Sequence, residues 1–181
     1  MKWLIASDIH GSYYYCKMLV ERFKEEKADK MLILGDILYH GPRNDLPKEY
    51  SPKKVEILLN GMKEKIICVR GNCDTEVDQM VLEFPILADY AVIDVQDRMI
   101  YASHGHKYGP DSMQFLQKGD VLLYGHIHVP KCYEKEGIQI FNPGSVSIPK
   151  ENSMHSYMVI EGKNVIWKNL YDGEEYLRSV L

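Results

Sequence analysis

Short apolar runs alternate with amphipathic segments through the first seventy residues, and this alternation constrains the fold more than any other feature. The runs span residues 2–7, 31–34 and 66–69. Between the first two, apolar side chains recur at the spacing of one helix face, at Cys16, Leu19, Val20 and Phe23. Between the last two, Pro52 after Ser51 is a typical helix start. The order β-α-β-α-β predicts an α/β fold, in which helices cross between strands of one sheet.

The second half of the chain is richer in strands. A short helix is expected at 78–82, and the apolar runs 90–95 and 99–103 flank a tight hairpin turn. Further strand-length runs lie at 121–124, 133–136, 138–141, 157–160 and 165–170. We therefore predict a second sheet packed on the first. With no repeat or linker, residues 1–181 are expected to form a single domain.

Composition excludes several classes of protein. A formal charge of −4 gives no bulk attraction for long nucleic acid. No run of about 18 apolar residues could span a membrane, and Asp8 comes too early for a signal peptide. We therefore expect a cytoplasmic protein whose four cysteines are reduced.

Polar side chains follow five of the predicted strands, at the point where each run ends. They are Asp8, His10, Asp36, Asn72, His104, His126 and His128. Ligands of open α/β sheets bind beyond the carboxyl ends of the strands, so these side chains should converge. The alternate positions of the pairs 8/10 and 126/128 predict extended backbone, which would point both members the same way. Glycines beside these residues would allow close backbone approach.

The residue types indicate a metal centre. Carboxylate, amide and imidazole ligands suit first-row divalent ions, and the set shows no preference for thiolate. Seven ligands are too many for one ion. They suit two ions that share a bridging carboxylate.

The five polar clusters resemble, in order, the motifs of the calcineurin-like metallophosphoesterases: DxH, GD, GN, a His-Gly pair and GHxH. Residues 40–44, 70–74 and 141–145 are also similar to the small bacterial YfcE-type phosphodiesterases, over essentially the whole chain. The resemblance implies a four-layer sandwich of two mixed sheets and helices. It also implies a metal-dependent phosphodiesterase that hydrolyses small phosphodiesters with a metal-bridging hydroxide, because two ions about 3.5–4 Å apart lower the pKa of a shared water.

Residue roles follow from the same resemblance. One ion would be held by Asp8, His10, Asp36 and His128, and the other by Asp36, Asn72, His104 and His126. Asp36 would bridge, and Asp36, Asn72 and His104 are the expected catalytic residues. Mn²⁺ is the expected metal, although these ligands also accept Fe, Co, Ni or Zn. A homo-oligomer, either a dimer or a tetramer, is implied as well.

One position departs from the wider superfamily. Many members have a histidine after the GN pair, implicated as the general acid for the leaving group, and this chain has Cys73. A thiol is a poor substitute, so we expect substrates with good leaving groups to react best. His106 is a candidate donor in its place, a hypothesis that an unchanged pH–rate profile in His106→Ala would remove. Arg43 and Cys73 are expected to contact the substrate.

Several alternatives stay open. The retromer scaffold subunit resembles this fold without metal-centre chemistry, so a binding module is the second hypothesis, although all seven ligand positions here keep suitable side chains. Phosphomonoesterase and nuclease are alternatives within the hydrolases. Asp74 is expected to cap the helix that follows it rather than to support a ligand. His155 is expected to be a solvated loop residue, and His40 is left outside the metal set.

Overall fold

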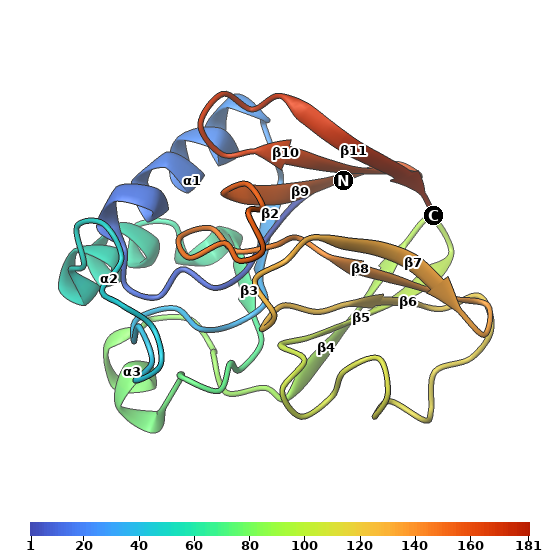
Figure 1. Ribbon diagram of the computed structural model, residues 1–181, viewed down its shortest axis with the longest axis horizontal. Helices are drawn as coiled ribbons and strands as arrows, with labels where there is room; N and C mark the ends of the chain where they lie inside the picture. The colour runs from blue at the N-terminus through green and yellow to red at the C-terminus, as the bar shows by residue number, and fades with distance from the viewer.

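Strand β1 (Lys2–Ala6) is buried on both faces, and its side chains explain why the molecule is layered. Successive side chains of a strand point to opposite faces of the sheet. Trp3 and Ile5 enter the core between two sheets, whereas Leu4 and Ala6 enter the core beneath the helices. The computed structural model describes residues 1–181 and shows two β-sheets stacked face to face (Figure 1).

Both sheets are mixed, as predicted. The six-stranded sheet has the order β11-β10-β9-β1-β2-β3, in which β1, β2 and β3 are parallel. Its other members are β2 (Lys30–Ile33), β3 (Ile66–Cys68), β9 (Ser156–Glu161), β10 (Asn164–Asn169) and β11 (Glu175–Val180). The five-stranded sheet has the order β4-β5-β6-β8-β7, in which β5, β6 and β8 are parallel. Its members are β4 (Tyr90–Val95), β5 (Arg98–Ser103), β6 (Val121–Leu123), β7 (Lys131–Lys135) and β8 (Ile138–Asn142).

Two helices cover the outer face of the six-stranded sheet. In α1 (Tyr13–Glu25), the predicted apolar face is buried, and the Ser12 hydroxyl caps the helix by accepting the N–H of Tyr15. Helix α2 (Pro52–Asn60) buries Val55 and Leu59. The 3-10 helix η1 (Lys63–Lys65) leads into β3, and the short helix α3 (Glu76–Val81) follows it.

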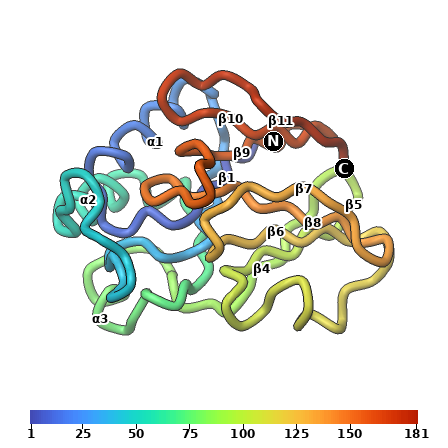
Figure 2. Tube along the Cα trace, in the orientation of Figure 1, coloured from blue at the N-terminus to red at the C-terminus, as the bar shows by residue number.

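The outer face of the five-stranded sheet has no helix. The irregular segment 104–120 runs along it instead, and Figure 2 traces this segment in yellow-green. Met113 from this segment packs against Leu122, Tyr124 and Ile140 of the sheet and its flank. The layer on this side of the molecule is therefore irregular chain.

The strand assignments also differ at the C-terminal end. No apolar run predicts a strand beyond residue 170, yet β11 pairs antiparallel with β10. Its residues alternate between exposed and partly exposed positions and include Glu175 and Arg178, so no apolar run marks it. Strand β7 begins two residues before the predicted run, at Lys131. No helix of the structure combines the length and the apolar character that crossing a bilayer requires.

Trp167 on β10 provides a test of the core between the sheets. Its ring is fully buried against Phe141, and its indole N–H donates to the carbonyl of Asn142 at 2.7 Å. Trp167→Phe leaves that buried carbonyl without this donor, so we expect the free energy of unfolding in urea to fall by about 1–3 kcal/mol. Tyr90→Phe, at an exposed position on β4, should change it by less than about 0.5 kcal/mol. Equal effects of the two substitutions would contradict the packing described.

Candidate metal centre

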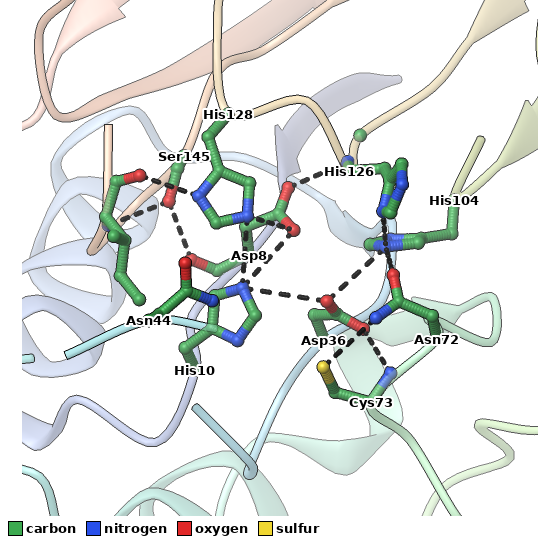
Figure 3. Close-up of polar contacts among 12 residues, drawn as sticks. Asp8, His10, Asp36, Asn44, Asn72, Cys73, His104, His126, His128 and Ser145 are labelled. Atoms are coloured by element: carbon green, nitrogen blue, oxygen red, sulfur yellow. Dashed lines mark hydrogen bonds and ion pairs between the residues drawn. The ribbon is translucent and has the colours of Figure 1, made fainter. Parts of the chain in front are cut away.

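The seven predicted ligands lie together where parallel strands of both sheets end. Asp8 and His10 follow β1, Asp36 follows β2, Asn72 follows β3, His104 follows β5, and His126 and His128 follow β6. Figure 3 shows two groups of side chains with Asp36 between them. The predicted convergence is therefore seen, and it needs both sheets, because each supplies part of each group.

The first group consists of Asp8, His10 and His128. Asp8 Oδ1 lies 3.2 Å from His128 Nε2 and 3.5 Å from His10 Nε2. The two imidazole Nε2 atoms are themselves only 3.2 Å apart. All three side chains are buried, and their ligand atoms converge on one small volume.

The second group is centred on His104. Its Nε2 lies 3.0 Å from Asn72 Oδ1 and 3.2 Å from His126 Nδ1. It also lies 3.4 Å from Asp36 Oδ2. That same carboxylate oxygen is 3.6 Å from His10 Nε2 in the first group. Asp36 Oδ2 therefore faces both groups, whereas Asp36 Oδ1 accepts the backbone N–H of Cys73 at 2.8 Å.

Backbone carbonyls determine which histidine nitrogen faces the centre. Nδ1 of His10, of His104 and of His128 lies within 2.8 Å of the carbonyl of Tyr39, Leu34 and Ile148, respectively. A carbonyl can only accept, so each Nδ1 must carry a proton, and each Nε2 has a free lone pair when the imidazole is neutral. Three imidazoles are thus oriented to offer Nε2 as a ligand.

The backbone at the ligands corrects one expectation. Asp8 and His10 have φ of 59° and 48°, and His126 and His128 have φ of 69° and 60°. These residues are in the left-handed region, not in the extended conformation that we predicted. In each pair, both side chains turn into the same cluster from left-handed backbone positions after the end of a strand (Figure 3). Non-glycine residues pay about 1–3 kcal/mol for such a conformation, which is typical of functional sites.

Two glycines allow the loops of Asp36 and Asn72 to meet. A Cβ on Gly71 would lie 2.1 Å from Asp36 Oδ1, and one on Gly35 would lie 2.5 Å from the Gly71 nitrogen. Neither position has room for a side chain, as expected from the sequence. Gly35-Asp36 and Gly71-Asn72 therefore pack directly against each other at the ends of the neighbouring strands β2 and β3.

The electrostatics favour a bound cation. Burial by itself would raise the pKa of Asp8, but His10 and His128 hold that pKa well below its usual range. Burial would lower the pKa of His104, but the carboxylates of Asp36 and Asp8 raise it to about 9. Asp8 Oδ1 is buried without a hydrogen-bond partner. An orphaned carboxylate oxygen beside free imidazole lone pairs fits a divalent metal ion.

Comparison with known proteins decides the family. A family model of the calcineurin-like phosphoesterase superfamily domain matches residues 1–164. The chain belongs to this superfamily. The phosphodiesterase YfcE of Escherichia coli strain K12 is 47% identical over 161 residues, covering 89% of this chain and 88% of that protein. A solved structure of the E. coli YfcE phosphoesterase matches with a TM-score of 0.96 at 43% identity and covers 99% of both chains.

More distant proteins share less with this chain. The probable metallophosphoesterase YsnB of Bacillus subtilis is 25% identical over 171 residues, covering 91% of this chain and 86% of that protein. A structure of Vps29 from Entamoeba histolytica has a TM-score of 0.68 at 20% identity, and it covers 100% of this chain and 99% of that one. The second likeness shows the fold alone. The chain is thus a close homologue of YfcE within a broad phosphoesterase fold family.

Asp74 supports the centre, which corrects the expectation that it caps a helix. Its carboxylate accepts the backbone N–H groups of Asp36, Ile37 and Gly71 at 2.7–2.9 Å. Thr75 caps α3 instead, in a capping box with Asp78. Burial raises the pKa of Asp74 to about 6, so the carboxylate is ionised at neutral pH and accepts all three bonds. Asp74, two residues after Asn72, therefore holds together the two loops that carry Asp36 and Asn72.

The other residues singled out in the sequence lie in different surroundings. Arg43 is exposed and lines this pocket together with Cys73. His106 is exposed, with its ring centroid 5.3 Å from that of His104. His155 contradicts the expectation of a solvated residue, because its ring stacks on Tyr15 with centroids 4.1 Å apart.

Sequence reasoning missed several residues that serve the centre. The hydroxyls of Ser145 and Ser147 both donate to the carbonyl of Asp8, at 2.9 and 3.0 Å. Ser145 ends the block 141–145 and Ser147 lies two residues beyond it, but the sequence does not show what these hydroxyls contact. Lys150 lines the same pocket as Arg43. Nothing in the sequence distinguishes Lys150 from the other lysines and arginines, which number 22 in all.

Asp74→Asn tests the support of the centre. The amide has one acceptor oxygen and a donor NH₂ group, so at least one of the three backbone N–H groups loses its acceptor. We expect metal affinity to fall about 10- to 100-fold, the usual effect of losing a partner that orients ligands. Direct titration with Mn²⁺ measures it, with the exposed Asp89→Asn as the matched control. An affinity equal to that of the control would show that Asp74 does not hold the centre.

The pKa of His104 predicts proton release. A group with a pKa of about 9 is largely protonated at about pH 7.5, and a histidine must be neutral to bind a metal. Ion binding should therefore release about one proton from this site, and affinity should rise with pH up to about pH 9. Calorimetric titrations in two buffers of different ionisation enthalpy measure the release, and His104→Asn should reduce it by about one proton. Identical heats in both buffers would rule this out.

Proposed function

We propose that the chain is a metal-dependent phosphodiesterase that hydrolyses small phosphodiesters at a two-metal centre. The observation that carries this proposal is the position of Asp36 Oδ2, which faces His10 at 3.6 Å on one side and His104 at 3.4 Å on the other. A carboxylate oxygen shared by two ligand groups is what a bridged pair of ions requires. The homology to the E. coli phosphodiesterase YfcE agrees with it.

The protein's own residues divide the work. Asp8, His10 and His128 would hold one ion, Asn72, His104 and His126 the other, and Asp36 both. When bound, two divalent ions supply a nucleophilic water of lowered pKa and neutralise the phosphoryl oxygens. Mn²⁺ is the proposed metal, and this oxygen and nitrogen set also accepts Fe, Co, Ni or Zn. Arg43 and Lys150, on the rim, would add positive charge beside the phosphate.

The thiol of Cys73 affects which leaving groups are expected to react well. Burial, followed by the charge of Asp36, raises the pKa of its thiol, so with these neighbours the group is a neutral, weak hydrogen-bond donor. A strongly basic leaving oxygen would gain little from it. Esters of acidic alcohols or phenols are therefore the proposed substrates, with His106 as the candidate proton donor.

Small substrates are favoured over long nucleic acid. The formal charge of −4 gives no general attraction for a polyanionic backbone. The cations that line the pocket over the cluster are Arg43 and Lys150, enough for one phosphate but not for a phosphate track. The retained ligand set speaks against a purely scaffolding protein.

A metal-reconstitution assay tests the proposal. Chelator-treated protein is given each divalent ion in turn, with a chromogenic nitrophenyl phosphodiester and the matching monoester as substrates. Asn72→Ala and His104→Ala should lower kcat/KM for the diester by about 100-fold or more, the scale of losing one group that stabilises charge in the transition state. Asn164→Ala, an exposed change at the start of β10, is the matched control and should retain activity.

Two results would contradict the proposal. Tight metal binding without turnover of either ester would favour a binding module. Turnover of the monoester alone would make the chain a phosphomonoesterase.

A further inference from the structure

An open groove lies beside the metal centre, between α2, α3 and the loop that follows β2. Its volume is about 730 Å³, far larger than the space directly over the ligand cluster. Tyr39, Tyr50, Val77 and Val81 supply most of its apolar lining. Large apolar side chains gathered around one concave surface are typical of a ligand site.

The groove is continuous with the metal centre through Cys73. This residue lines both the groove and the pocket over the ligand cluster. Its backbone N–H donates to Asp36 Oδ1 at 2.8 Å, and its sulfur lies 3.2 Å from Asn72 Nδ2. Figure 3 shows Cys73 next to Asp36, at the side of the cluster. A molecule held over the cluster therefore meets the groove at Cys73.

The apolar side chains of the groove remain accessible. Val77 is 68% exposed, Tyr39 is 42% exposed and Val81 is 39% exposed. The backbone carbonyl of Tyr39 accepts the Nδ1 proton of His10 at 2.8 Å, so the main chain of this loop is held by a residue of the centre. The aromatic side chain of Tyr39 is thus presented from a fixed backbone.

We propose that this groove binds the ester substituent that stays on phosphorus, and that this substituent is an aryl or similarly flat apolar group. The inference rests on the proposed phosphodiesterase function and names its substrate class. In an in-line displacement, the attacking and leaving oxygens lie on opposite sides of phosphorus, and the remaining ester oxygen points sideways. The groove is lined mainly by apolar side chains, and its polar residues include the acidic Glu56 and Asp78, so it suits a neutral substituent that stays on phosphorus better than a leaving group that departs as an anion.

A diester needs this second site, whereas a monoester does not. The substituent that stays on the phosphorus of a diester extends beyond the polar surroundings of the phosphate. It displaces water when it lies on Tyr39 and Val77. Burial of an aryl ring against these side chains would favour aryl over methyl diesters. The polar rim, with Lys53, Glu56 and Asp78, keeps the open side of the groove in contact with water.

The test keeps the leaving group constant and changes the staying group. kcat/KM is measured for phenyl 4-nitrophenyl phosphate and for methyl 4-nitrophenyl phosphate, and their ratio is the readout. We expect a ratio above one in the wild-type enzyme and a fall of about tenfold in Tyr39→Ala and Val77→Ser, the scale of a lost contact in an apolar pocket. Met80→Ser changes an exposed apolar residue of the same helix outside the groove lining and should keep the wild-type ratio.

Equilibrium binding provides a readout that needs no turnover. Phenylphosphonate should bind the manganese-loaded protein more tightly than methylphosphonate in calorimetry, and Tyr39→Ala should remove most of the difference. An unchanged kcat/KM ratio in both groove variants would overturn the proposal. If the variants also had an altered oligomeric mass, the groove would be a self-association surface instead. Absence of turnover of either diester by the wild type would instead contradict the proposed function, and the binding arm would then decide on the groove alone.

Discussion

The buried carboxylate of Asp36 is the feature on which the rest of the centre depends. A buried charge is costly unless hydrogen bonds or opposite charges surround it. The backbone N–H of Cys73 satisfies Oδ1, and His10 and His104 face Oδ2 from opposite sides. Asp74 in turn holds the backbone N–H of Asp36 at 2.8 Å. One carboxylate thus joins the two ligand groups, and a second one keeps it in place.

Both sheets meet at this point, because each ligand group takes side chains from loops of both sheets. The loops after β1, β2 and β3 come from one sheet, and those after β5 and β6 come from the other. Contacts such as His104 Nδ1 to the carbonyl of Leu34 join the two sets across the sheets at 2.6 Å. Burial in the core between the sheets, together with Ser145 and Ser147, offsets the strain of the left-handed ligand residues. Stability of the core and geometry of the site are therefore coupled.

Much of this arrangement could be predicted from the sequence. Runs such as 2–7 and 31–34 are buried on both faces, so apolar composition alone marks them as strands. Polar residues directly after such runs are expected at the edge of the sheet where the parallel strands end. The strand positions and the convergence of the seven candidate ligands followed from these two rules.

The remaining features depend on contacts that a linear pattern does not contain. Strand β11 is an edge strand with charged residues, and it is defined by its pairing with β10. Asp74 suits a helix cap equally well until the backbone N–H groups of a neighbouring strand end are seen beside it. Lys150 reaches the pocket only because its segment packs next to His128. In each case, the partner is distant in the chain.

The most direct test of the bridging role of Asp36 is the number of Mn²⁺ ions bound per chain, measured by elemental analysis together with electron paramagnetic resonance. Wild-type protein should hold two ions with the spectrum of a coupled pair. Asp36→Asn should hold at most one ion, without coupling. A single ion in the wild type, or two coupled ions retained in Asp36→Asn, would contradict a centre built on this carboxylate.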